Sequence, residues 1–204
     1  MKVKICGLRT QKDVEIVNKA LPDFVGFILA PGRRRTVTPE QVAELRAGLD
    51  KRIKAVGVFV DAPLEEPYDL LKKGIIDIAQ LHGKEQPRYV HNLKILTGMP
   101  LFQAFIIKDE KDIRQAFYSH ADVVLLDAGT GDGKTFDWNL IRNFSAPYLL
   151  AGGLSPDNIA EAIELCHPWG VDVSSGVETN GSKDERKVLE FVRICREYDK
   201  REGK

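Results

Sequence analysis

Val123-Val124-Leu125-Leu126-Asp127 is an unbroken apolar run that ends in a carboxylate. A strand with one face in water alternates apolar and polar residues, whereas a continuous apolar run is typical of a strand buried on both faces of a parallel sheet. Most of the seven other short runs have the same character, so the sequence predicts a parallel sheet of eight strands. The predicted strands cover residues 3–6, 24–29, 55–60, 78–81, 101–106, 123–127, 148–151 and 171–174.

Helix-forming segments lie between these runs. Thr38-Pro39-Glu40-Gln41 combines a capping hydroxyl, a proline at the first helical position and a glutamine three residues after the cap. Ser155-Pro156 repeats the cap followed by proline, and residues 183–198 carry apolar side chains at helical spacing. The helices expected after Pro63 and after Thr135 are short.

Eight strands, each followed by a helix or a helix-length gap, predict an α/β fold: a single-domain (β/α)8 TIM barrel over residues 1–204. The alternative is a doubly wound open sheet, which also alternates strands with helices. That fold seldom needs eight strands in so short a chain, and no Gly-x-Gly-x-x-Gly follows the first strand. The pattern favours the barrel.

Composition narrows the class of protein. Thirty basic and thirty acidic residues give a formal net charge of zero, which does not indicate a nucleic-acid partner or an anionic membrane surface. The start, Met1-Lys2-Val3-Lys4, lacks the apolar stretch of a signal peptide, and no run approaches a membrane-spanning length. Three cysteines without a Cys-x-x-Cys pair argue against a disulfide framework and a zinc ribbon. We therefore expect a cytoplasmic protein.

Two loops near the end of the chain are candidates for a phosphate site. Gly152-Gly153 follows the seventh predicted strand and Ser175-Gly176 follows the eighth. Glycines allow close backbone approach, and inward-pointing amide groups bind an anion without a lysine. The corresponding loops carry the recurrent phosphate site of these barrels, although isolated glycines also serve tight turns.

Cys6 and Asp127 stand at the carboxyl ends of the first and sixth predicted strands, where barrel enzymes build their active sites. Cysteine is often simply buried, but at a strand exit Cys6 can meet a ligand. A functional Cys6 would work as a thiolate, its pKa lowered by nearby positive charge or helix termini. A carboxylate that ends an apolar strand is costly unless it faces the polar mouth, where partial burial would raise the pKa of Asp127 and let it donate a proton. The pair suits proton abstraction and proton delivery at one site.

Basic side chains follow the second and fourth predicted strands. Of Arg33, Arg34 and Arg35, we expect two to be solvated and one to reach inward with a fork that fits a carboxylate. His82, in Gln80-Leu81-His82-Gly83, either lines the site or fixes a loop.

Residues 128–135, Ala-Gly-Thr-Gly-Asp-Gly-Lys-Thr, nearly match a P-loop. Ala128 replaces the first glycine, and Thr135 leads only to a short segment before Pro147 rather than to a substantial helix. We interpret the segment as a glycine-rich lid over the barrel mouth and not as an ATPase motif.

Taken together, these motifs resemble the phosphoribosylanthranilate isomerases of tryptophan biosynthesis. The matching pieces occur in family order across almost the whole chain, and jointly they are highly specific. They are residues 3–7, 25–28, 57–60, 80–83, 126–127, 133–138, 152–154 and 171–178.

The resemblance implies an Amadori rearrangement of N-(5-phosphoribosyl)anthranilate to 1-(2-carboxyphenylamino)-1-deoxyribulose 5-phosphate. It implies that Cys6 is the general base, that Asp127 is the general acid and that Arg35 binds the anthranilate carboxylate. The backbone around Gly152, Gly153, Ser175 and Gly176 would bind the phosphate, and His82 would contact the substrate. No metal or organic cofactor is implied, and the partner is a small-molecule substrate. Asp172 matches a family aspartate near the site without an assigned role, and the chain is expected to be a monomer or a homodimer.

Three alternatives remain at this point. The related isomerases of histidine biosynthesis, or a dual-substrate version of them, perform the same rearrangement on a different aminophosphoribosyl compound. Those enzymes use two aspartates and lack the start Lys4-Ile5-Cys6-Gly7. A P-loop ATPase would bind ATP with magnesium. A non-catalytic phosphosugar-binding barrel would bind ligand without turnover, and it gives no reason to keep Cys6 together with Asp127.

Overall fold

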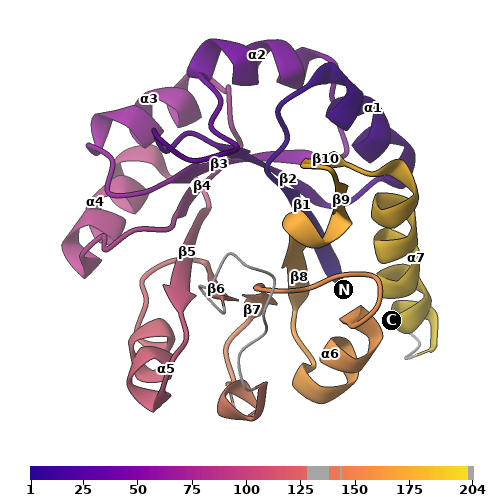
Figure 1. Ribbon diagram of the computed structural model, residues 1–204. Helices are drawn as coiled ribbons and strands as arrows, with labels where there is room; N and C mark the ends of the chain where they lie inside the picture. Colours follow the sequence, from indigo (N-terminus) through magenta and orange to yellow (C-terminus); the bar gives the residue numbers. More distant parts are fainter. Residues whose placement is uncertain (128–137, 143, 202–204) are drawn as a thin grey trace.

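Eight parallel strands form a closed barrel in sequence order, in a computed structural model that describes residues 1–127, 138–142 and 144–201. The ring closes where the first strand pairs with the eighth (Figure 1). Each predicted strand is confirmed to within two residues at its ends. The strands are β1 Lys2–Cys6, β2 Phe24–Ile28, β3 Lys54–Phe59, β4 Ile78–Leu81, β5 Leu101–Ile106, β6 Val123–Asp127, β7 Tyr148–Leu150 and β8 Gly170–Val173.

Helices surround the barrel on its outer face (Figure 1). The α-helices are α1 Gln11–Ala20, α2 Pro39–Ala47, α3 Glu65–Lys72, α4 Pro87–Thr97, α5 Glu110–Phe117, α6 Ile159–Cys166 and α7 Glu185–Arg201. The described part of the sixth crossover has a short 3-10 turn, η1 Trp138–Ile141, where the other units have an α-helix. After β8 the chain forms the 3-10 turn η2 Ser175–Val177 and a small hairpin of β9 Glu178–Thr179 with β10 Ser182–Lys183.

Of the two helix caps predicted from the sequence, at Thr38 and at Ser155, the first is confirmed and the second is wrong. At α2, Thr38 Oγ1 accepts a hydrogen bond from the Gln41 amide, and Gln41 Oε1 accepts one from the Thr38 amide, so the predicted cap is confirmed. The cap predicted at Ser155 is wrong, because α6 begins at Ile159. The Asn158 side chain instead bonds the amide of Ser155 and the carbonyl of Gly153, which stabilises a turn ahead of the helix.

The structure of β6 explains why the apolar run in residues 123–127 is continuous. Val123 and Leu125 point into the barrel interior, whereas Val124 and Leu126 pack under the surrounding helices. Both faces of β6 are therefore buried, as parallel strands require. Inside the barrel, Phe24 and Phe102 pack edge to face with ring centroids 5.4 Å apart. This apolar plug closes the barrel below its polar mouth.

No helix in the described ranges is long and apolar enough to cross a membrane.

Candidate active site

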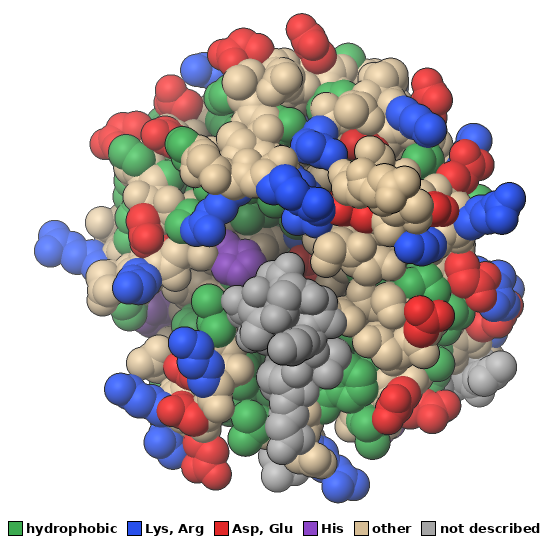
Figure 2. Space-filling view, viewed as in Figure 1, with side chains coloured by type: hydrophobic (Ala, Val, Ile, Leu, Met, Phe, Trp, Pro, Cys, Tyr) green, Lys and Arg blue, Asp and Glu red, His purple; other side chains and the backbone are tan. Residues whose placement is uncertain are grey.

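A cavity of about 400 Å³ opens at the carboxyl ends of the barrel strands. Figure 2 shows this face, with Lys and Arg side chains along one side of the central hollow. The topology explains the gathering, because all eight strands run in the same direction and their carboxyl ends meet at one mouth. All eight side chains or loop residues predicted from the sequence line the cavity: Cys6, Arg35, His82, Asp127, Gly152, Gly153, Ser175 and Gly176.

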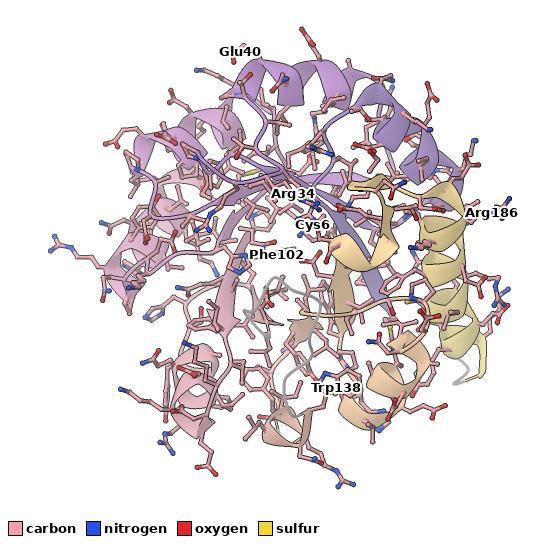
Figure 3. The ribbon with its side chains drawn as sticks, in the orientation of Figure 1. Cys6, Arg34, Glu40, Phe102, Trp138 and Arg186 are labelled. Atoms are coloured by element: carbon pink, nitrogen blue, oxygen red, sulfur yellow. The ribbon has the colours of Figure 1, made fainter. Side chains whose placement is uncertain are left out.

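Cys6 ends β1 and lies toward the centre of the barrel (Figure 3). Its side chain is buried, and the residue is only 7% exposed. Burial raises the pKa of the Cys6 thiol, although the charge and hydrogen bond of Lys4 act in the opposite direction. The expectation that positive charge would lower this pKa below its ordinary value is therefore wrong, since desolvation disfavours the thiolate more strongly.

Asp127 ends β6 and meets His82, which follows β4. His82 Nε2 lies 3.4 Å from Asp127 Oδ2, and Gln80 Nε2 lies 3.3 Å from His82 Nδ1. With the amide of Gln80 as donor, His82 Nδ1 accepts and Nε2 carries the hydrogen that faces the carboxylate. His82 thus both lines the cavity and orients Asp127, whose raised pKa stays a prediction.

The two glycine-containing loops pack against each other. Gly152 and Gly153 have φ values of 87° and 67°, a left-handed conformation that side chains disfavour. A Cβ on Gly176 would lie 1.8 Å from the carbonyl oxygen of Leu154, so this approach requires glycine. The loops after β7 and β8 therefore form one continuous wall of the cavity. Glycine-containing loops of this kind bind anions through backbone amides.

The three arginines all line the cavity, but they differ in exposure. Arg33 and Arg34 are exposed, whereas the Arg35 side chain is only 17% exposed and reaches inward. Arg35 donates two hydrogen bonds to Glu178, at 2.6 Å and 2.9 Å. Arg34 adds a third at 2.5 Å, and Figure 3 shows this side chain directed toward the barrel mouth.

Sequence reasoning missed the partners of these groups. The Glu178 carboxylate also accepts a hydrogen bond from Lys183 Nζ at 3.0 Å, and both side chains are almost fully buried. Below Cys6, a buried ion pair joins Lys4 to Asp172 with Nζ 3.0 Å from Oδ1. Lys4 stands two residues before Cys6 on the same face of a strand, and that spacing could have identified it.

Two further expectations concern the lid and metal ions. The glycine-rich lid expected at residues 128–135 lies outside the described residues. Among the side chains that the structure describes, no group of three or more His, Cys, Asp or Glu is arranged to hold a metal ion.

Comparison with known proteins gives one consistent result. A family model described as N-(5′-phosphoribosyl)anthranilate (PRA) isomerase matches residues 3–194. A protein of Endomicrobium trichonymphae named N-(5′-phosphoribosyl)anthranilate isomerase is 42% identical over 203 residues, which cover 96% of this chain and 98% of the relative.

Solved structures agree in fold and sequence. A phosphoribosyl anthranilate isomerase in complex with reduced 1-(o-carboxyphenylamino)-1-deoxyribulose 5-phosphate has a TM-score of 0.86 at 31% identity, over 97% of this chain and 99% of its own. Monomers generated from the dimeric phosphoribosylanthranilate isomerase of Thermotoga maritima have a TM-score of 0.86 at 32% identity over the same shares.

Proposed function

The chain belongs to the family of N-(5′-phosphoribosyl)anthranilate isomerases of tryptophan biosynthesis, and we propose that its barrel mouth performs the family's rearrangement with Cys6 as general base and Asp127 as general acid. The observation that carries this proposal is the single cavity that both side chains share with the two phosphate-loop candidates. A relative bound to a reduced form of the expected product supports the same substrate class.

The first step opens the ribose ring. Asp127 donates its proton to the ring oxygen, and the bond between that oxygen and C1′ breaks with its electron pair moving to the oxygen. The lone pair of the anthranilate nitrogen forms the iminium bond to C1′. His82 holds the Asp127 carboxyl group in position for this transfer.

The second step forms the new double bond. The Cys6 thiolate takes the proton from C2′, and the C2′–H electron pair becomes the C1′=C2′ bond while the iminium pair returns to nitrogen. In the resulting enolamine the O2′ proton passes to solvent and C1′ takes a proton from solvent, which gives the ketone. Cys6 releases its proton and Asp127 regains one by the same exchange, so that both return to their starting states. Since burial disfavours the thiolate, groups that stabilise it decide how effective Cys6 is as a base.

Binding uses the two ends of the substrate. The loops containing Gly152, Gly153, Ser175 and Gly176 hold the 5′-phosphate through backbone amides. Arg35 binds the anthranilate carboxylate, and its contact with Glu178 fixes the guanidinium group over the mouth.

The test is the loss of phosphoribosylanthranilate fluorescence on adding purified protein, with EDTA present and no nucleotide. We expect loss well above spontaneous hydrolysis, and the rearranged ketone as product. Cys6→Ser should lower turnover by about 10²–10⁴, whereas Cys166→Ser on α6 serves as the control for removing a buried thiol. Full activity of Cys6→Ser would remove the base assignment.

Three further expectations stay predictions: a single domain, a cytoplasmic location, and a monomer or homodimer. The Thermotoga maritima relative is described as dimeric. Light scattering of the purified chain at several concentrations distinguishes a monomer from a homodimer.

A further inference from the structure

Lys4 is a buried cation for which the proposed mechanism has no role. Its side chain is fully buried inside the barrel, with Nζ 3.0 Å from Asp172 Oδ1. The pairing follows from the sheet, because Lys4 of β1 lies directly opposite Asp172 of β8. Burying an ion pair is costly, and well-packed apolar residues of similar size often stabilise a protein as much or more. Fold stability is therefore a weak explanation for this pair.

The Lys4 ammonium group lies beside the Cys6 sulfur. The two residues are two positions apart on one strand, so their side chains point to the same face. Both converge on Gly26 of β2, where an added Cβ would lie 2.6 Å from Cys6 Sγ and 3.1 Å from Lys4 Nζ. The missing side chain at Gly26 leaves the space in which Lys4 Nζ and Cys6 Sγ lie side by side.

Two other cations lie near Cys6, and each of them, like Lys4, is paired with a carboxylate. Lys183 from β10 donates to the Ser174 carbonyl and to Glu178. Arg35 passes over Gly7, where a Cβ would lie 2.5 Å from Arg35 Cδ, and its guanidinium group is bound to Glu178.

Across the cavity stand Asp127 and His82, which contact each other. Among the cations that the structure describes, Lys4 shares the space at Gly26 with the sulfur, and its charge acts on the Cys6 thiol more strongly than that of Lys183.

We propose that Lys4 is a positioning residue for the isomerisation: its ammonium group, held by Asp172, donates a hydrogen bond to Cys6 Sγ and stabilises the thiolate that removes the C2′ proton. This inference rests on the proposed role of Cys6 as base. Lys4 itself cannot take the proton, because the pKa of its ammonium group is raised: burial lowers it, but Asp172 and Cys6 outweigh that effect.

Lys4 and Asp172 should act on Cys6 in opposite directions. The positive charge of Lys4 favours the thiolate and lowers the pKa of the thiol, whereas the carboxylate of Asp172 raises it. A pair that served only to hold the strands together would make both variants less stable without shifting Cys6 ionisation in opposite senses.

The experiment measures the alkylation of Cys6 by iodoacetamide from pH 6 to 11, followed by mass spectrometry of the Cys6 peptide. We expect Lys4→Met to move the midpoint to higher pH and to slow alkylation at neutral pH by about tenfold or more. Asp172→Asn should move the midpoint to lower pH. Lys2→Met is the matched control, because this lysine of the same strand is half-exposed and paired with Asp23.

Lys4→Met leaves a buried carboxylate without its partner, and folding is checked by circular dichroism. If it does not fold, the double variant Lys4→Met with Asp172→Asn removes both charges and should still raise the midpoint, since the stronger influence on Cys6 is that of Lys4. Unchanged midpoints in folded variants, or shifts of both single variants in the same direction, would overturn the proposal.

A second readout links the shift to turnover. In Lys4→Met the rise of kcat/KM with pH should move to higher pH, and activity should recover toward that of the wild type in alkaline buffer. The alkylation measurement needs no turnover, so it tests the inference even if the chain proves inactive on phosphoribosylanthranilate. Inactivity would count against the proposed function, whereas an unshifted pH midpoint of Cys6 alkylation would count against the role of Lys4.

Discussion

Arg35 and Glu178, which are 143 residues apart in sequence, form a bidentate pair at the barrel mouth with Nε 2.6 Å from Oε1 and Nη2 2.9 Å from Oε2. The Glu178 carboxylate therefore occupies one full edge of the guanidinium group. A substrate carboxylate must bind the remaining Nη1 side or displace Glu178. Since Lys183 and Arg34 also hold Glu178 in place, the first arrangement is the one that preserves the network.

Arg35→Ala should weaken productive substrate binding more than it slows the chemical step. A hydrogen bond to a charged group contributes about 1.5–3 kcal/mol, which corresponds to a KM roughly ten- to a hundredfold higher. Arg35→Lys should recover little of this loss, because an ammonium group cannot reproduce the fork. Steady-state kinetics with Arg114→Ala, an exposed arginine on α5, as the control will check the prediction. An unchanged KM in Arg35→Ala would show that the anthranilate carboxylate binds elsewhere.

Glu178 should make the fold sensitive to acid. Burial opposes its ionisation, but the hydrogen bonds from Arg35 and the charge of Lys183 outweigh it and lower the pKa of Glu178 to about 2. A carboxyl group whose pKa is lower in the folded state stabilises the protein at pH values above the pKa that it has in the unfolded state. That stability is lost as the pH falls toward 2. The lowering from 4.5 corresponds to at most about 3 kcal/mol at neutral pH, and solvent screening at the barrel mouth makes the contribution smaller.

Urea unfolding between pH 2 and 7 measures this effect. The free energy of unfolding of the wild type should fall as pH decreases from about 5 to 2, and Glu178→Gln should lose this part of the pH dependence. The exposed Glu161→Gln on α6 is the matched control. Equal slopes for wild type and Glu178→Gln would assign the acid sensitivity to other carboxylates.

The outline of the site could be predicted because backbone topology alone fixes it. Once apolar runs such as residues 123–127 are recognised as parallel strands, Cys6 and Asp127 must stand at the same mouth. The pairing of Arg35 with Glu178 could not be predicted in this way. It depends on how long side chains from distant loops meet across the mouth, and strand order does not determine that.

The direction in which the pKa of Cys6 shifts also could not be predicted from the sequence. Positive charge from Lys4 and desolvation have opposite effects, and the outcome depends on how completely the barrel buries the thiol. The start of α6 was predicted wrongly because it too depends on side-chain contacts that the residue types alone do not show. Ser155-Pro156 has the residue types of a cap, but the side-chain bonds of Asn158 place a turn there and delay the helix to Ile159.

Asp127→Asn should reduce kcat by about 10²–10⁴, because the amide retains the shape of the side chain but has no acidic proton to donate to the ring oxygen. KM should change little if the residue acts in proton transfer rather than in binding. The fluorescence assay with Asp69→Asn, an exposed aspartate on α3, provides the comparison. Turnover within a few fold of the wild type would mean that another group protonates the leaving oxygen.

Gly176→Ala should separate the two phosphate loops. The new Cβ would lie 1.8 Å from the Leu154 carbonyl oxygen, and because that neighbour is backbone the loops themselves must move. We expect a loss of about 1–3 kcal/mol of stability, as is typical of overpacking, together with weaker competitive inhibition by inorganic phosphate. Gly48→Ala is the control, since the φ of this glycine is −91° and the atoms that its Cβ would meet are at the end of the Gln11 side chain, which can move. If Gly176→Ala loses no more stability than Gly48→Ala and keeps its inhibition by phosphate, the anion does not bind between these loops.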